Sequence, residues 1–356
     1  MTQPGSTVPS DGSFTELIDG SHILICCGSG GVGKTTTAAV LALEGARRGR
    51  NAMVVTIDPA RRLANALGLE SLSNEAHEID RSLWDPNRTA PSTGRLFALM
   101  LDTKSTFDHL VHKYAGSPEQ AEEILKNRFY KNVSGFLSGT QEYMAMEKLH
   151  ELHEEGGYDL IVIDTPPTRN ALDFLDAPRR LTRMLENRIF RLLMMPTRLY
   201  LRAATFAVQT FLRTVSKVVG SEVIDDIVTF FRTFEGMEEG FRQRAHTVDK
   251  LLNDSRTSFI LITSPRRDSL EEAHFFTERL AENNIGIDGL IVNRVHPRFG
   301  KERPEGLDAR AETFAAMNGD SDGPAARLAT LYRNLSDFEE VAERERRQLS
   351  GLQDSI

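Results

Sequence analysis

Cysteine is almost absent from this chain of 356 residues, and the two that occur, Cys26 and Cys27, are neighbours. Adjacent cysteines do not cross-link distant parts of a fold, so a disulfide framework of the kind found in small secreted proteins is excluded. The sequence also has no CxxC pair and no cluster of His and Cys at zinc spacing. We therefore expect a cytoplasmic protein whose fold does not depend on disulfides or zinc.

An excess of positive charge and a long apolar run are also missing. Lys and Arg number 43 against 51 Asp and Glu, a formal net charge of -8, so we expect no nucleic-acid partner. No segment approaches the roughly 18 apolar residues of a membrane-spanning helix, so we expect no direct membrane span. Residues 1–20 have neither the basic start nor the apolar middle of a signal peptide, and their composition predicts a disordered tail.

Six short apolar runs are continuous and rich in β-branched residues, which is typical of strands in a parallel sheet covered on both faces. Helical stretches separate the runs, and this alternation predicts a doubly wound, mostly parallel α/β sheet. The six runs are His22–Cys27, Ala52–Ile57, Leu96–Leu101, Asp159–Ile163, Ser258–Thr263 and Gly289–Asn293.

Two connections, at about residues 102–157 and 178–255, are too long for one crossover helix. Both have apolar residues at helical spacing, which predicts a helical subdomain beside the sheet. The second is rich in Met and Phe between Leu181 and Phe234, as an adaptable client-binding surface would be, although such a stripe is more often core or a dimer interface. The mixed-charge stretch from Leu335 to Ile356 predicts an exposed helix.

A phosphate-binding loop is the strongest signal in the sequence. It fits GxxxxGK[ST] directly between a strand and an Ala-rich helix, where glycines let backbone N–H groups surround phosphates and the helix N-terminus adds positive potential. We expect Lys34 to contact the β- and γ-phosphates of ATP, Thr35 to ligate Mg²⁺, and Thr36 to lie beside the nucleotide. The loop consists of Gly28, Ser29, Gly30, Gly31, Val32, Gly33, Lys34 and Thr35.

The same glycines also satisfy GxGxxG, the dinucleotide-binding fingerprint, through Gly28, Gly30 and Gly33. Asp58 lies 25 positions beyond Gly33, about where a dinucleotide fold places its ribose-binding acid. Lys34 and the threonine after it favour the phosphate loop, because a dinucleotide fold needs neither.

Two aspartates follow apolar strands at the edge of the sheet where ligands bind. Asp164, in IVIDTPP, is placed to hold the water shell of Mg²⁺, although an Asp at a strand end is often a cap or turn former. Asp58, in TIDPARRL, is a candidate to orient the attacking water or to cap the next helix. We therefore take Lys34, Asp58 and Asp164 as the candidate catalytic residues, with Thr35 and Asp164 as the metal ligands.

Taken together, these motifs resemble the ArsA-type ATPases, which include arsenite-pump ATPases and tail-anchored-protein-targeting ATPases. The resemblance covers about residues 22–300 and is closest to the actinobacterial branch. It implies that Asp58 activates water, that Asp164 couples Mg²⁺ to a second switch, and that Asn293 binds adenine; without the family, Asn293 would be a strand-end turn residue. The motifs are CCGSGGVGKTTTAA, TIDPARRLANALG, GTQEYMAMEKL, DTPPTRNALDFLDAP and GLIVNRVHP.

The chain departs from this family pattern in four ways. The signature lysine of the loop is replaced by Ser29, so we expect either a homodimer with slow turnover or a heterodimer with a lysine-bearing paralogue. Cys26 and Cys27 are expected to be core residues rather than arsenite ligands. The CxxC of zinc-held dimers is missing, and the family's final strand is not evident before Ile356.

The sequence thus predicts a single ATPase domain over residues 21–356, with its helical insertions. Its expected function is Mg²⁺-dependent ATP hydrolysis coupled to conformational change in a dimer, with a hydrophobic or membrane protein as the candidate client. A nucleotide-gated chaperone with negligible turnover and a dinucleotide-binding oxidoreductase remain as alternatives.

Overall fold

The computed structural model describes residues 11–57, 62–128, 130, 140–167, 176–180, 182–183, 186, 226, 229–230, 233, 236–283, 285–300, 302–317 and 323–353. Within them the strands form one seven-stranded sheet in the order β3-β4-β2-β5-β1-β6-β7. The strands are β1 (Ile23–Gly28), β2 (Asn51–Thr56), β3 (His77–Glu78), β4 (Arg95–Met100), β5 (Leu160–Asp164), β6 (Thr257–Thr263) and β7 (Gly289–Val292).

The sheet confirms the predicted α/β fold and all six predicted strands. Strands β4, β2, β5 and β1 pair in parallel, as do β6 and β7. The residues of β1, β5 and β6 are buried throughout, which explains their continuous apolar sequence. The sequence analysis missed β3, a two-residue strand with both residues exposed that pairs antiparallel with β4.

Helices occupy the connections between these strands. In the described residues they are α1 (Asp11–Gly20), α2 (Lys34–Arg47), α3 (Arg62–Ala66), α4 (Arg81–Trp84), α5 (Thr103–Tyr114), α6 (Pro118–Lys126), α8 (Thr140–Glu155), α14 (Glu238–Leu252), α15 (Arg267–Glu282), α16 (Pro304–Ala316) and α17 (Pro324–Gln353). None of these helices is both long and apolar enough to cross a membrane.

The chain divides into two compact units, which we describe separately. The main unit comprises Thr15–Cys27 and Lys34–Phe259. The C-terminal unit comprises Met1–Phe14, Gly28–Gly33 and Ile260–Ile356.

Residues 11–20 correct one expectation from the sequence. They form helix α1 and are not part of a disordered tail. In the main unit, the Ile18 side chain is buried, Asp19 pairs with Arg48, and Arg50 donates hydrogen bonds to the carbonyls of Ile18 and Ser21. The polar composition that suggested disorder therefore belongs to a short helix held by two arginines of the loop after α2.

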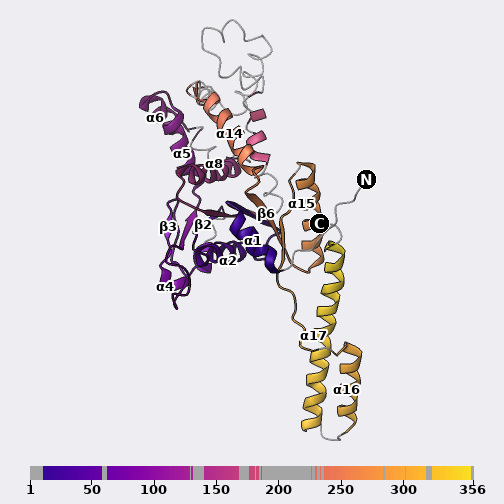
Figure 1. Cartoon of the computed structure of the whole chain (residues 1–356). Helices are drawn as coiled ribbons and strands as arrows, with labels where there is room; N and C mark the ends of the chain where they lie inside the picture. The colour runs from indigo at the N-terminus through magenta and orange to yellow at the C-terminus, as the bar shows by residue number, and fades with distance from the viewer. Residues whose placement is uncertain are drawn as a thin grey trace, which may run out of the picture. The chain divides into compact units, whose positions relative to one another are not determined.

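Within the connections at 102–157 and 178–255, where the sequence predicts a helical subdomain, the described residues include helices α5, α6, α8 and α14. Figure 1 shows α5, α6, α8 and α14 gathered at one end of the main unit. Their shared core includes Leu110, Ile124, Tyr143, Met144 and Phe241.

A buried ion pair ties two of these helices together. Arg244 of α14 donates to Glu147 of α8 at 2.9 Å, and the hydroxyl of Tyr143 donates to the other carboxylate oxygen. Most of the stretch between Leu181 and Phe234, including the proposed client surface, lies outside the described residues.

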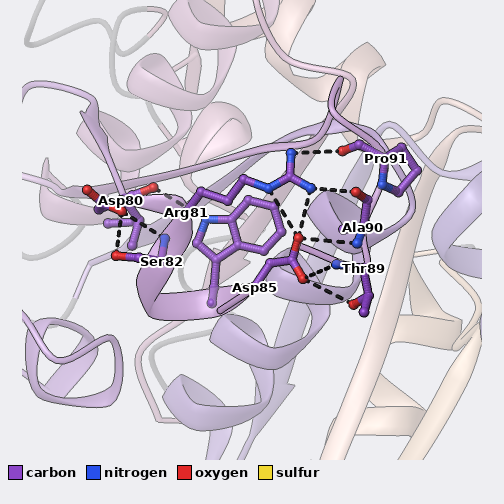
Figure 2. A network of polar contacts seen from close by, with 9 residues as sticks. Asp80, Arg81, Ser82, Asp85, Thr89, Ala90 and Pro91 are labelled. Carbon is purple, nitrogen blue, oxygen red and sulfur yellow. Dashed lines mark hydrogen bonds and ion pairs between the residues drawn. The ribbon is translucent and has the colours of Figure 1, made fainter. Parts of the chain in front are cut away.

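A buried carboxylate organises the segment that connects α4 to β4 (Figure 2). Asp85 accepts hydrogen bonds from the guanidinium of Arg81 at 2.8 and 3.1 Å, and from the backbone N–H groups of Thr89 and Ala90 at 2.8 and 3.2 Å. Burial of the Asp85 carboxyl is the largest influence and raises its pKa, but these bonds together outweigh it and lower the pKa to about 2. The carboxylate is therefore charged at neutral pH, and it joins Arg81 of α4 to the backbone of Thr89 and Ala90.

In the C-terminal unit, α16 packs along the first half of α17 to form a helical hairpin (Figure 1). Glu339 of α17 is almost fully buried, and it accepts hydrogen bonds from the backbone N–H groups of Phe299 and Gly300 and from Arg298. In the described part of the chain no strand follows β7, which agrees with the missing final strand noted in the sequence. The predicted C-terminal exposed helix is confirmed, but it begins already at Pro324.

Candidate functional site

The first part of the predicted phosphate loop, Gly28–Gly33, lies in the C-terminal unit, and two of its glycines have no room for a side chain. A Cβ on Gly28, which has a φ of +150°, would lie 1.9 Å from the carbonyl oxygen of Ile262. A Cβ on Gly33, with a φ of +100°, would lie 2.4 Å from Nδ2 of Asn293. Only glycine combines these positive φ angles with such close approaches.

Asn293 explains the second of these approaches, because its side chain contacts the loop directly. Its Nδ2 donates to the carbonyl oxygen of Val32 at 2.8 Å, and its Oδ1 accepts from the backbone N–H of Arg294 at 2.8 Å. The backbone N–H of Asn293 donates to Thr263 at 2.9 Å, which continues the pairing of β7 with β6. The structure therefore brings Asn293 into contact with the phosphate loop, as expected for two parts of one site. The binding of adenine by Asn293 stays a prediction.

The second part of the loop begins helix α2 in the main unit. Lys34 is the first residue of α2 and is buried, with 8% of its surface exposed. The hydroxyl of Thr35 donates to Oδ2 of Asp164 at 2.7 Å, and Asp164 is the last residue of β5. The predicted pair of metal ligands, Thr35 and Asp164, is therefore in contact.

A residue that the sequence analysis missed also contacts this carboxylate. Thr56, at the end of β2, donates from its hydroxyl to Oδ2 of Asp164 at 2.9 Å. The register of the sheet explains the contact, since Thr56 and Asp164 lie opposite each other on neighbouring parallel strands. The only signal in the sequence is a hydroxyl residue near the end of a predicted strand, at the start of the TIDPARRL motif.

The donor atoms of this pair fit a magnesium ion. Mg²⁺ prefers hard oxygen ligands and keeps several waters or phosphate oxygens, so one hydroxyl and one carboxylate from the protein suffice. A transition-metal site is not supported, because the described residues contain no group of three or more His, Cys, Asp or Glu side chains placed to hold a metal.

The two cysteines are core residues, as predicted. Cys26 and Cys27 are buried in β1, with at most 1% of their surface exposed. Burial raises the pKa of the Cys27 thiol to about 12 and that of the Cys26 thiol well above its usual value. Because the thiolate is the metal-binding form, these protonated thiols are poorly suited to bind arsenite or a metal ion.

The remaining site predictions fall into two groups. Asp58, the candidate water activator, lies outside the described residues, as does Arg61 of the same motif. Ser29, at the position of the family's lysine, is buried with 6% of its surface exposed, whereas Thr36 is exposed in the first turn of α2.

Comparisons with known proteins show the family to which the chain belongs. Residues 21–317 match the family model described as Anion-transporting ATPase, and the chain therefore belongs to that family. Membership confirms the resemblance to ArsA-type ATPases and identifies the chain as a nucleotide-binding ATP hydrolase of that type. The dinucleotide-binding alternative is set aside on this ground.

Individual relatives are distant in sequence but extensive in coverage. A "Putative arsenical pump-driving ATPase 1" from Aquifex aeolicus is 24% identical over 290 residues, which cover 78% of this chain and 64% of that protein. The "ATPase get3" of Schizosaccharomyces japonicus is 22% identical over 293 residues, covering 82% of this chain and 80% of that one. An "ATPase ASNA1 homolog" from Entamoeba dispar is 24% identical over 275 residues, which cover 76% of this chain and 75% of that protein. This chain thus spans less than two thirds of the Aquifex protein.

Proposed function

We propose that this chain hydrolyses ATP with the help of Mg²⁺ held by Thr35 and Asp164, and that hydrolysis changes the conformation of a dimer. The observation that supports this proposal most is the 2.7 Å hydrogen bond from the Thr35 hydroxyl to Asp164. In phosphate-loop ATPases the loop hydroxyl and a strand-end aspartate together hold the magnesium ion. This chain has the two groups in contact.

Each residue of the site has a chemical role in this proposal. The backbone N–H groups of the loop and the N-terminus of α2 attract the phosphates, and Lys34 neutralises charge on the γ-phosphate. Bound Mg²⁺ would supply further neutralisation of the β- and γ-phosphate oxygens. Thr56 orients the Asp164 carboxylate through its hydrogen bond, and Asp58 is proposed to activate the attacking water.

The nature of the dimer depends on Ser29. A serine hydroxyl is short and neutral, so it does not replace a lysine that reaches a partner's phosphates. We propose that this chain pairs with a paralogue that carries the lysine, or that it forms a slowly hydrolysing homodimer. In the second case it would act mainly as a nucleotide-gated chaperone.

The cargo is proposed to be a hydrophobic protein client in the cytoplasm rather than arsenite. The burial of Cys26 and Cys27 supports this choice, because it removes the thiolates that arsenite would need. A pull-down from the native cytosol with ATP present would identify the partner ATPase and the client. Recovery of neither would count against both assignments.

Magnesium-dependent binding of a fluorescent ATP analogue tests the metal site directly. Asp164→Asn should weaken binding at least about tenfold with Mg²⁺ present and change it little without Mg²⁺, because only the metal complex needs the carboxylate. Asp159→Asn is a matched control, since Asp159 lies just before β5 and accepts a hydrogen bond from the backbone of Asn51 at 2.8 Å. Equal binding by wild type and Asp164→Asn with Mg²⁺ present would exclude the proposed ligand.

A further inference from the structure

Residues 294–300, which we call the strap, connect the predicted adenine-binding residue Asn293 to the segment before α16. The strap follows β7, the edge strand of the sheet, and its residues form neither helix nor strand. It belongs to the C-terminal unit, together with the first part of the phosphate loop and α17. Because the strap continues no ladder of the described sheet, its path depends on the side chains that bind its backbone.

Two glutamates of α17 bind the strap. Glu345, with 14% of its side chain exposed, accepts from the backbone N–H of His296 at 2.8 Å, and its other oxygen lies 2.7 Å from Nδ1 of the same residue. Glu339 accepts from the backbone N–H groups of Phe299 and Gly300 at 2.7 and 3.2 Å. Burial is the largest influence on the Glu339 carboxyl and raises its pKa, but its hydrogen bonds together outweigh burial and lower the pKa. The strap is therefore fixed to α17 at two points by charge-assisted hydrogen bonds.

Arg294, the first residue of the strap, has a backbone conformation that arginine rarely adopts. Its φ is +62°, and Arg88 is the one other non-glycine residue with a positive φ in the described part of the chain. A left-handed conformation of this kind persists only where the surrounding structure enforces it. On one side of Arg294 the backbone N–H of Asn293 donates to Thr263 of β6, and on the other side Glu345 binds the strap two residues later.

This conformation of Arg294 orients the side chain of Asn293. The backbone N–H of Arg294 donates to Oδ1 of Asn293 at 2.8 Å, and Nδ2 then faces the carbonyl of Val32 in the phosphate loop. The terminal torsion of an asparagine side chain is otherwise soft, so this hydrogen bond decides which way the amide points. Helix α17 thus acts on Asn293 through the strap and Arg294.

We propose that Glu345, with Glu339 binding the far end of the strap, is a positioning residue for recognition of adenine. It keeps Arg294 in its left-handed conformation and thereby keeps the amide of Asn293 oriented, without touching the nucleotide itself. This inference rests on the proposed function, since it takes Asn293 as the group that binds the base. Breaking the contact should therefore weaken selection of the base and spare the binding of the phosphates.

Competition binding of ATP and GTP tests the positioning role. Glu345→Ala should lower the preference for ATP over GTP at least about fivefold, because Arg294 is then free to leave its strained conformation. Glu345→Gln should retain most of the preference, since its side-chain carbonyl still accepts from His296. Glu340→Ala is the matched control, because this glutamate of the same helix pairs with Arg344 and not with the strap. Equal losses of ATP and GTP affinity in Glu345→Ala would overturn the proposal.

Arg294→Asn tests the link through the strained residue. Asparagine adopts the left-handed conformation more readily than arginine does. The variant should keep the preference for ATP, and in the Glu345→Ala chain it should restore part of what was lost. A general loosening of the C-terminal unit would not be repaired by this change, so failure to restore the preference would contradict the proposed route.

Hydrogen exchange without nucleotide separates a failure of this inference from a failure of the proposed function. A peptide that ends at Arg294 reports the N–H that donates to Asn293, and it excludes the N–H of His296, which loses its partner directly. Exchange in this peptide should be faster in Glu345→Ala and unchanged in Glu340→Ala. Unchanged exchange in Glu345→Ala would overturn the inference even if the chain binds ATP. A chain that binds neither nucleotide would contradict the proposed function, and faster exchange in its Glu345→Ala variant would still show that α17 holds Arg294.

Discussion

The side-chain amide of Asn293 donates a hydrogen bond at 2.8 Å to the carbonyl of Val32, a residue 261 positions earlier in the chain. Because Oδ1 of Asn293 accepts from Arg294, the side chain is held at both ends. The amide links the end of β7 to the phosphate loop, and its Nδ2 lies 2.4 Å from where a Cβ on Gly33 would be. A residue that the family implies as a base-binding group thus also supports the loop.

Asn293→Ala separates these two roles. We expect the variant to lose discrimination between ATP and GTP, since a side-chain amide both donates to and accepts from the adenine edge. Competition binding with the two nucleotides measures the ratio of their affinities, and Asn253→Ala, at the end of α14, is a control. If both affinities fall while their ratio stays constant, Asn293 supports the loop and does not select the base.

Ser29→Lys tests whether the missing cation limits turnover. Trans-acting cations of this type contribute about 10³-fold or more to the rate of phosphoryl transfer, so the variant or an added lysine-bearing paralogue should accelerate hydrolysis strongly. Steady-state phosphate release on the purified chain measures this effect. Fast wild-type turnover that is unchanged by Ser29→Lys and lost in Arg61→Ala or Arg62→Ala would show instead that an arginine of the TIDPARRL motif supplies the charge.

Asp85 should make the stability of the main unit sensitive to acid. Its pKa is lowered to about 2 in the folded chain, compared with the usual 3.8, so its contribution is fully present above pH 4 and is lost as the pH falls toward 2. Asp85→Asn should therefore lower the thermal midpoint by a few degrees at neutral pH, and the difference from wild type should shrink between pH 4 and pH 2. Thermal melts across this range measure the effect, with the exposed Glu70→Gln as the control. A constant difference across the range would contradict the role assigned to the charged carboxylate.

The sequence predicted those parts of the molecule that local patterns encode. Continuous apolar runs predicted six strands, and the loop motif predicted that Thr35 and Asp164 meet at the edge of the sheet. Strand β3 was missed because two exposed residues carry no periodicity, and α1 was missed because its composition is polar. The hydrogen bonds from Thr56 to Asp164 and from Asn293 to Val32 join distant segments, so no local pattern reveals them.

The C-terminal hairpin shows the same limit. Its mixed charges predicted an exposed helix, which α17 is, but they did not predict that α16 would pack along it. Nor did they predict that Glu339 is buried and holds the segment before α16, since its partners Phe299 and Gly300 lie about 40 residues earlier in the chain. Residue type alone suggested a solvent-facing carboxylate at this position.

The central claim is that ATP is hydrolysed at the loop containing Lys34. The most direct measurement is phosphate release from Mg²⁺-ATP by the full chain under single-turnover conditions, which detect slow hydrolysis. Wild type and the exposed-lysine control Lys104→Ala should both hydrolyse ATP. Lys34→Ala should be reduced at least about 100-fold, because it removes the cation that stabilises charge on the γ-phosphate. Hydrolysis by Lys34→Ala at the wild-type rate would contradict the assignment.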